Sequence, residues 1–215
     1  MGNILVTGGC GFIGSNLVDK LIELNENVIV IDDLSTGQLV NKNNLARYYE
    51  QNILDYIDDK EKLLSLLNEN KIDIVYHLAA LADVRLSIND PINCYNINHL
   101  ASISILDICC EAGVKKFIFT STSAVYGTPE YQPVDEKHPV DPISPYGLSK
   151  LAFEQYSRYK SKFNQNIEIV IFRLPNVYGP RQRADLEGGV VAIFQNLMEN
   201  NNNVTFFGEG DQTRD

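Results

Sequence analysis

Thr-Gly-Gly-Cys-Gly-Phe-Ile-Gly, residues 7–14, is the stretch that decides the fold of this chain. It follows an apolar run, Asn3–Val6, that is typical of a buried strand, and it leads into a helical pattern of apolar residues from Phe12 to Ile22. Three glycines spaced three residues apart permit a tight turn, close approach of backbone to a pyrophosphate, and close packing of helix on strand. The unpaired N–H groups of the helix N-terminus would then face the anion. The stretch therefore predicts a dinucleotide-binding turn, and the alternative is a loop that uses glycine for conformational reasons alone.

An acidic pair follows the next apolar run. Val28–Ile31 reads as a second strand, and it ends in Asp32 and Asp33, about 20 residues beyond the glycine turn. At that distance in a βαβ nucleotide fold, a carboxylate accepts hydrogen bonds from the ribose hydroxyls and repels the 2′-phosphate of NADP. The alternative is a solvated acidic turn. Asp32 thus predicts NAD as the cofactor, and the loop Leu34–Gly37 is expected to close over the same ribose.

Length and composition limit the class of protein. The 215 residues, with 44% hydrophobic and 21% charged content, suit one well-buried domain and part of a second. A formal net charge of −10 argues against nucleic acid as a partner. No apolar run approaches the roughly 20 residues of a membrane span, so we expect a cytoplasmic protein. Four cysteines without a Cys-x-x-Cys pair predict buried thiols and no metal site.

The rest of the chain alternates between strand and helix patterns, which predicts an α/β fold: a Rossmann-type doubly wound parallel sheet with helices on both faces. A proline-rich segment from Val125 to Pro145 is expected to be irregular. Further strands are expected at Arg47–Gln51, Ile72–Leu78 and Phe117–Phe119, and helices around Leu63–Leu67, from Pro91 and through Tyr146.

Polar residues at the strand ends and on the helices are candidates for chemistry. A hydroxyl-rich run, residues 120–123, follows the fifth strand, and Thr122 could orient a reacting group. Tyr146 and Lys150 are four residues apart, so on a helix they share one face, and the ammonium would lower the pKa of the phenol. Such a tyrosine could take a proton from a sugar hydroxyl while hydride leaves the same carbon. Asn98 is either a satisfied polar residue inside its helix or a contact to the cofactor or the lysine.

Taken together, these landmarks resemble the extended short-chain dehydrogenase/reductase family, and within it the NAD-dependent nucleotide-sugar epimerases of the UDP-glucose 4-epimerase type. The resemblance covers essentially the whole chain. Its motifs are the glycine turn, residues 32–37, His77–Ala80, Ser121–Gly127, Ser144–Lys150, Arg173–Gln182 and Phe207–Asp215.

The resemblance implies roles for individual residues. Tyr146 would be the acid/base, Lys150 would lower its pKa and bind the nicotinamide ribose, and Thr122 would hydrogen-bond the reacting hydroxyl. The cofactor residues expected are Gly8, Gly11, Phe12, Ile13, Gly14, Asp32, Asp33, Ser35, Thr36, Gly37, Asn52, Ile53, Leu78, Ala79, Ala80, Asn98, Tyr146 and Lys150. The expected substrate residues are Thr122, Ser123, Tyr146, Asn176 and Arg214, with Arg214 at the diphosphate of a UDP-sugar.

The resemblance also defines alternatives and boundaries. Sugar-nucleotide 4,6-dehydratases carry an acidic pair just after the equivalent hydroxyl residue; Ser123 and Ala124 stand there instead, which favours epimerisation. Relatives extend roughly another hundred residues, so we expect a C-terminally truncated chain: residues 1–175 as the NAD-binding domain and 176–215 as an incomplete substrate lobe. An NAD-binding fragment without activity, or a decarboxylase or dehydratase of the same family, remains the alternative.

The helices beginning near Pro91 and Tyr146 are expected to form a homodimer face.

Overall fold

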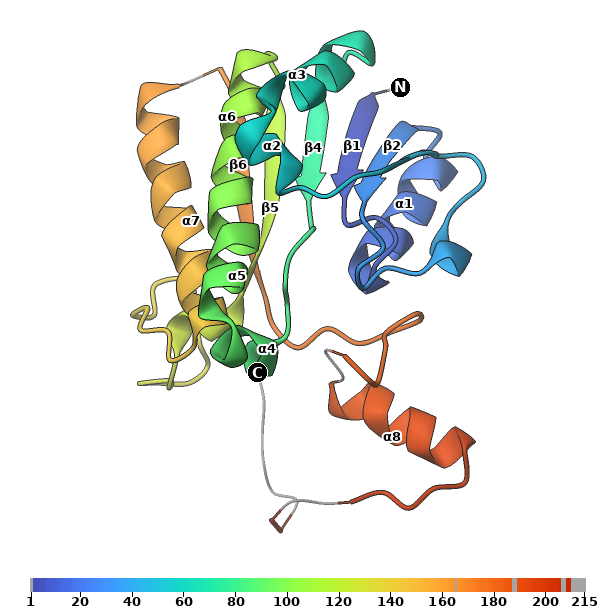
Figure 1. Cartoon of the computed structure of the whole chain (residues 1–215). Helices are drawn as coiled ribbons and strands as arrows, with labels where there is room; N and C mark the ends of the chain where they lie inside the picture. The colour runs from blue at the N-terminus through green and yellow to red at the C-terminus, as the bar shows by residue number, and fades with distance from the viewer. Residues whose placement is uncertain (1, 165, 187–188, 206–207, 210–215) are drawn as a thin grey trace.

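The computed structural model describes residues 2–164, 166–186, 189–205 and 208–209. Within them the chain forms a six-stranded parallel sheet in the order β3-β2-β1-β4-β5-β6 (Figure 1). The chain starts in the middle of the sheet and proceeds first to one side and then to the other, so β1 and β4 flank a topological switch point, where ligands of open α/β sheets bind. The predicted fold class is confirmed. The strands are β1 Asn3–Thr7, β2 Asn27–Asp32, β3 Arg47–Glu50, β4 Ile74–His77, β5 Lys116–Thr122 and β6 Glu168–Leu174.

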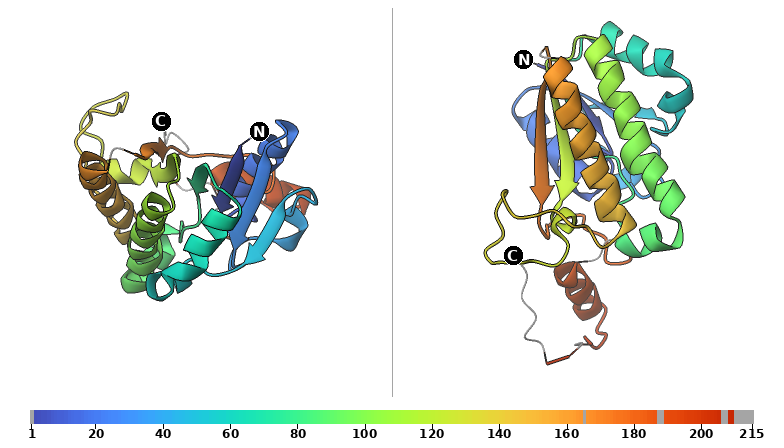
Figure 2. Two further views of the ribbon diagram at one scale, coloured as in Figure 1. Left: turned by 90° about the horizontal axis from the view of Figure 1, so that it is seen from above. Right: turned by 90° about the vertical axis from the view of Figure 1, so that its left-hand side faces the viewer.

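Two apolar clusters cover the two faces of the sheet. Because successive strand residues point to opposite faces, Ile4 and Val6 of β1 pack with Val18 under α1, whereas Leu5 between them packs with Phe119 and Phe153 on the other face. Helices therefore lie on both sides of the sheet (Figures 1 and 2). The helices are α1 Phe12–Glu23, α2 Asp55–Asp58, α3 Lys60–Glu69, α4 Val84–Asn89, α5 Pro91–Tyr95, α6 Ser102–Glu111, α7 Pro145–Phe163 and α8 Val190–Glu199, with 3₁₀ turns η1 Leu39–Asn41 and η3 Ser123–Tyr126 and a π turn η2 Asn96–Ala101.

Three features differ from the sequence-based expectation. The helix that begins at Pro91 contains the π turn η2, so α5, η2 and α6 form one helical run with a local widening. The strand at Phe117–Phe119 extends through Thr122, which puts the hydroxyl cluster inside β5. Three elements, α2, α4 and β6, were not predicted, although the apolar run of β6 is a strand signal.

The segment after the sheet is less buried. Figure 1 shows α8 beneath the carboxyl edge of the sheet, and it has no buried residue. The apolar run Val190–Met198 predicts a helix, and α8 confirms it. The run Val204–Phe207 predicts a strand, but Val204 and Thr205 are not in one, and residues 206–207 lie outside the described part. None of the described helices combines the length and apolar character required to cross a membrane.

Candidate functional site

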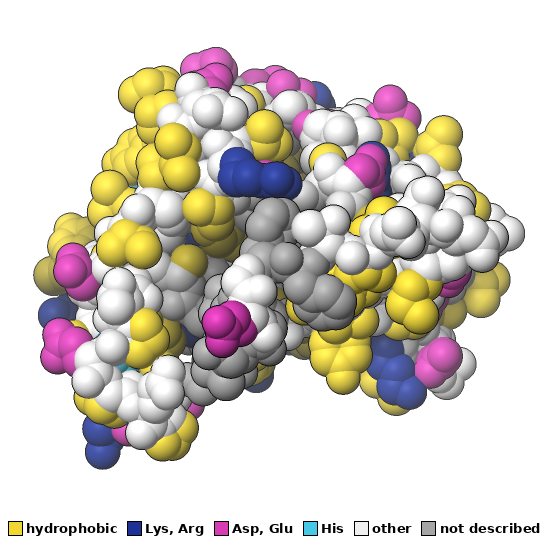
Figure 3. All heavy atoms as spheres, turned by 90° about the horizontal axis from the view of Figure 1, so that it is seen from below, with side chains coloured by type: hydrophobic (Ala, Val, Ile, Leu, Met, Phe, Trp, Pro, Cys, Tyr) yellow, Lys and Arg dark blue, Asp and Glu magenta, His cyan; other side chains and the backbone are white. Residues whose placement is uncertain are grey.

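The carboxyl ends of the strands open into a cavity of about 1650 Å³. Figure 3 looks onto this edge of the molecule, where hydrophobic side chains gather around basic ones near the upper middle of the view. Two predicted cofactor residues, Gly37 and Asn98, do not line the cavity, and Arg214 lies outside the described residues. The predicted residues that do line it are Gly8, Gly11, Phe12, Ile13, Gly14, Asp32, Asp33, Ser35, Thr36, Asn52, Ile53, Leu78, Ala79, Ala80, Thr122, Ser123, Tyr146, Lys150 and Asn176.

The glycine turn has the geometry of an anion cradle. Gly8 has a φ of +71°, and a Cβ there would lie 2.7 Å from the backbone nitrogen of Ala79. A Cβ on Gly14 would lie 2.1 Å from the carbonyl oxygen of Gly8, so the helix meets the turn with no room for a side chain. Gly11 caps α1 without a side-chain hydrogen bond, and the first N–H groups of a helix have no intrahelical partner. The turn therefore offers backbone donors to a phosphate group.

The acidic pair at the end of β2 is held in place from several sides. One oxygen of Asp32 accepts a hydrogen bond from the Cys10 N–H (2.8 Å) and the other accepts one from the Leu34 N–H (2.9 Å). Burial raises the pKa of Asp32 more than these hydrogen bonds lower it. A Cβ on Gly37 would lie 2.8 Å from Oδ1 of Asp32, so Gly37 gives the loop room to pass the carboxylate.

The second carboxylate of the pair, Asp33, is hydrogen-bonded to Asn52, another of the expected cofactor residues. Oδ2 of Asp33 accepts a hydrogen bond of 2.9 Å from the side-chain amide of Asn52. Oδ1 accepts one from the Ser35 N–H at 2.9 Å. Together with Asp32 these side chains form an oxygen-rich wall with the acceptors that ribose hydroxyls require.

The candidate catalytic residues share the cavity with the glycine turn. Ser144 caps α7 by accepting from the Gly147 N–H (3.1 Å), and this fixes the first turn, which carries Tyr146. Lys150 is 2% exposed; its Nζ donates to the Thr120 carbonyl at 3.0 Å and lies 4.6 Å from the centre of the Phe119 ring. Oγ1 of Thr122 accepts from the Ala124 N–H at 3.1 Å. A phenol, an ammonium and a hydroxyl therefore line one cavity.

A buried histidine, which sequence reasoning did not assign to the site, connects the glycine turn to the helix of Asn98. Oγ1 of Thr7 accepts hydrogen bonds from Leu78 and Ala79 N–H, both 3.2 Å, and lies 2.7 Å from Nδ1 of His77. The Thr7 hydrogen therefore goes to Nδ1, and the opposite ring nitrogen, Nε2, donates to Oγ of Ser102 at 2.9 Å. Burial, and to a lesser extent the charge of Lys150, lower the pKa of His77 to about 3.

Asn98 holds the segment that follows β4. It is fully buried in the π turn; its Oδ1 accepts from the Leu81 N–H (2.8 Å) and its Nδ2 donates to the Leu81 carbonyl (2.9 Å). Nδ2 also donates to Oγ of Ser149 at 3.2 Å, and that hydroxyl donates to the Tyr146 carbonyl at 2.8 Å. The side chain thus fixes the position of two walls of the cavity relative to each other.

An ion pair behind the hydroxyl-rich strand was also missed. Glu154, whose side chain is 1% exposed, accepts hydrogen bonds from Nε and Nη2 of Arg173 (3.1 and 2.7 Å) and from Oγ of Ser121 (2.5 Å). The guanidinium of Arg173 lies 4.8 Å from the centre of the Tyr126 ring. The signal that could have revealed it is an arginine inside an apolar strand, because a charge in that setting requires a partner.

Comparisons with known proteins agree with this geometry. Residues 4–215 match the model of the NAD dependent epimerase/dehydratase family. A putative UDP-glucose 4-epimerase of Methanocaldococcus jannaschii is 44% identical over 99% of this chain and 68% of its own length. The structure of a Thermotoga maritima UDP-glucose 4-epimerase with UDP-glucose is similar, with a TM-score of 0.93, 42% identity and coverage of 99% of this chain and 68% of that one. A UDP-N-acetylglucosamine 4-epimerase of Methanobrevibacter ruminantium, in complex with UDP-N-acetylmuramic acid, gives a TM-score of 0.92 at 35% identity, covering all of this chain and 68% of that chain.

Proposed function

The chain belongs to the NAD dependent epimerase/dehydratase family, and on that basis we propose that it is a UDP-sugar 4-epimerase, an isomerase that interconverts UDP-glucose and UDP-galactose or their N-acetyl analogues. The observation that carries this proposal is the shared cavity: Tyr146, Lys150 and Thr122 line the same space as the glycine turn and Asp32. The names of the similar proteins support the same reaction.

The residues present fit NAD. The glycine turn supplies backbone donors for the pyrophosphate, and Asp32 supplies acceptors for the adenosine ribose. Lys150 would hold the nicotinamide ribose. When bound, NAD accepts hydride from the sugar and returns it.

The reaction needs a base that later acts as an acid. Tyr146 would remove the proton from the sugar 4-OH, and the buried ammonium of Lys150 would favour the phenolate. The hydroxyl of Thr122 would hydrogen-bond the reacting oxygen. After the 4-keto sugar turns over, Tyr146 would return the proton to the oxygen at C4 as hydride arrives on the other face of the ring.

The substrate side of the cavity is built by residues from both parts of the chain. We assign Ser123, Asn176 and Arg214 to the sugar nucleotide. Residues 1–175 would form the NAD-binding domain and 176–215 part of a substrate lobe. The exposed position of α8 supports this division. The chain spans about two thirds of the length of the relatives described above.

The proposal includes a homodimer and a cytoplasmic location. In Figure 2 the run α5–η2–α6 lies beside α7, and α5 and η2 contact α7 directly. Large apolar side chains are exposed on these elements, and a second copy would cover them. They include Ile92, Leu100, Leu148, Tyr159 and Phe163. All four cysteines are free thiols, as in proteins of reducing compartments.

One set of measurements separates the epimerase from its two alternatives, a cofactor-binding fragment and an enzyme with another reaction of the family. Turnover of UDP-galactose and UDP-N-acetylgalactosamine by this chain, with NAD bound, supports the epimerase. Tyr146→Phe is expected to abolish turnover and to retain NAD binding; equal activity of the variant overturns the assignment. NAD binding without affinity for any nucleotide sugar supports a cofactor-binding fragment, and formation of a decarboxylated or dehydrated product supports another reaction of the family.

A further inference from the structure

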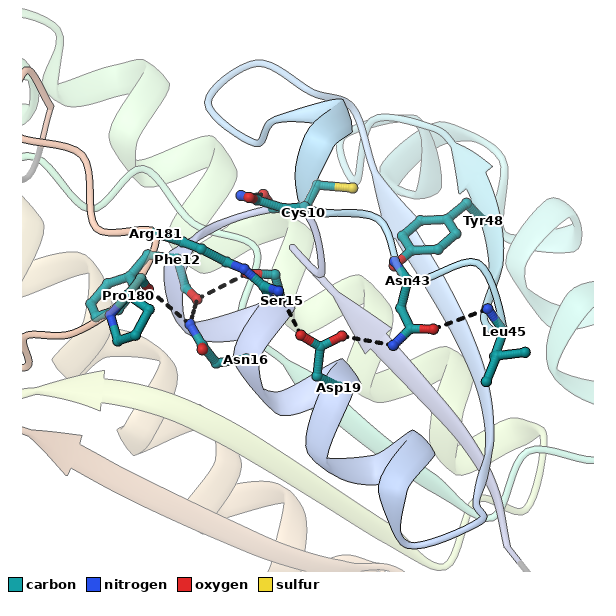
Figure 4. A network of polar contacts seen from close by, with 11 residues as sticks. Cys10, Phe12, Ser15, Asn16, Asp19, Asn43, Leu45, Tyr48, Pro180 and Arg181 are labelled. Carbon is teal, nitrogen blue, oxygen red and sulfur yellow. Dashed lines mark hydrogen bonds and ion pairs between the residues drawn. The ribbon is translucent and has the colours of Figure 1, made fainter.

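Residues 176–186, which we call the strap, return from the end of β6 to the outer face of α1. Figure 4 shows the first anchor: Nη2 of Arg181 lies 2.6 Å from Oδ2 of Asp19, and Oδ1 of Asp19 accepts a hydrogen bond from the Asn43 amide at 2.7 Å. One turn earlier on α1, Nδ2 of Asn16 donates to the Pro180 carbonyl at 3.0 Å. The contacts of Arg181 and Pro180 with α1 join residues more than 160 positions apart.

A second anchor lies at the loop that follows β2. Nη1 of Arg183 donates to the carbonyl of Thr36 at 3.2 Å, and Asp185 holds the same guanidinium through Nε and Nη2. Thr36 belongs to the wall that the ribose of a dinucleotide would face. The strap is therefore attached to both segments that build the cofactor half of the cavity.

The backbone of the strap is strained where it is anchored. Arg181 has a φ of +73°, a left-handed conformation that a side chain disfavours. Such a conformation persists when surrounding contacts impose it, and it is frequent in segments that switch. The Arg181–Asp19 pair, the Asn16 bond to the Pro180 carbonyl and the Gln182 N–H bond to the Gly179 carbonyl (3.3 Å) help to hold this conformation.

The strap and the glycine turn face one another across two spaces. Asn176, Val177, Gln182 and Leu186 of the strap line the large cavity that the turn also lines. A second space of about 20 Å³, roughly the size of a water molecule, lies between Arg181, Arg183 and Leu186 on one side and Cys10–Phe12 and Thr36 on the other. The strap therefore lies against the outer side of the glycine turn, separated from it here by a space of about the size of one water molecule.

We propose that the strap is a latch that retains the cofactor, and that Asp19, Arg181 and Arg183 set the rate at which NAD leaves. This inference rests on the proposed function. An epimerase returns hydride to the same sugar that gave it, so the cofactor has to stay bound through both halves of the reaction. Opening the latch breaks one partly exposed ion pair and two hydrogen bonds to carbonyls, those of Pro180 and Thr36. These few contacts are consistent with slow, reversible release.

The test measures release of NADH, followed by its fluorescence after mixing with excess NAD. Asp19→Asn and Arg181→Gln are each expected to accelerate release by roughly threefold to tenfold, the range expected for a partly exposed charged hydrogen bond. The double variant should release NADH little faster than either single variant, because both substitutions remove the same contact. Exchange of the charges, Asp19→Arg with Arg181→Asp, should restore part of the slow release. Arg183→Gln tests the second anchor independently and is expected to accelerate release as well.

Glu23→Gln is the matched control, because it removes another carboxylate of α1, one that forms an exposed ion pair with Lys20. This variant should release NADH at the same rate as the native chain. High salt should speed release from the native chain more than from Asp19→Asn, since it screens the ion pair. Unchanged release from all three anchor variants overturns the latch while the proposed function stands. A native chain that binds neither NAD nor NADH overturns the proposed function and the latch with it.

Discussion

The hydroxyl of Thr7 lies 2.7 Å from Nδ1 of His77, and this contact fixes the protonation of a fully buried ring. Thr7 already accepts two backbone N–H bonds, so it must donate to the ring. The other ring nitrogen donates to Ser102, whose hydroxyl donates to the Asn98 carbonyl at 2.8 Å. The neutral ring therefore links the glycine turn to the helix that carries Asn98.

Lowering the pH should destabilise the protein through His77. Its pKa is about 3 in the folded chain and near 6.5 when unfolded, so the unfolded state takes up the proton first. The stability due to the neutral ring is present above pH 6.5 and is lost as the pH falls toward 3. Between pH 7 and pH 5 the loss should be about 2 kcal/mol.

Urea unfolding of the native chain and of His77→Gln at both pH values isolates this contribution, because the other titrating groups are common to both proteins. The variant should be less stable at pH 7 but should lose about 2 kcal/mol less on acidification. An identical pH dependence in the two proteins would contradict the assignment of a neutral buried ring.

Gly14→Ala should weaken dinucleotide binding strongly. Its Cβ would be placed 2.1 Å from the Gly8 carbonyl oxygen, so either the turn or α1 has to move. We expect NADH affinity to fall at least about tenfold and stability by roughly 1–3 kcal/mol, by titration and urea unfolding. Gly113→Ala is the control: its φ of +75° is also unfavourable for alanine, but, apart from its chain neighbours, no part of the described chain lies within 4 Å of the added Cβ. It should lose about 1 kcal/mol of stability and keep its NADH affinity.

The parts of the fold that follow from local pattern could be predicted from the sequence. The glycine turn, the acidic strand end and the Tyr146–Lys150 spacing each depend on residues within one strand or one helical turn. The π turn could not be predicted, because residues 96–101 carry an ordinary helical pattern. The strand β6 was not predicted; its apolar run, residues 169–172, stands between the charged Glu168 and Arg173 and is short.

Contacts between distant segments account for most of what the sequence did not reveal about the site. The position of Asn98 in its helix does not show whether its side-chain amide binds a ligand or a backbone group. In the structure, the amide forms two hydrogen bonds with the backbone of Leu81. The anchor between Asp19 and Arg181 joins residues 162 positions apart. Sequence alone gives no signal for such a pair, since both residues are common on exposed surfaces.

The buried pair of Glu154 and Arg173 should be among the most costly charges to remove. Glu154→Gln leaves the Arg173 guanidinium beside Tyr126 without its carboxylate, and we expect a loss of about 3 kcal/mol in urea unfolding. Glu111→Gln is the control, because its pair with Lys60 is exposed; it should change stability by less than about 1 kcal/mol. Similar small losses for both variants would show that the Glu154 site relaxes without its charge.

Asn98→Asp should distinguish a structural role from a direct ligand contact. The substitution keeps the acceptor for the Leu81 N–H but places a carboxylate oxygen against the Leu81 carbonyl, in a position with no solvent exposure. We expect a stability loss of about 3 kcal/mol, together with weaker NADH binding, because Leu81 and the alanines before it line the cavity. Asn93→Asp is the control, since Asn93 also lines the cavity but is only half-buried, whereas Asn98 is fully buried. Its stability should change by less than about 0.5 kcal/mol. A variant at position 98 that keeps full stability and loses only NADH affinity would instead place the amide on the cofactor.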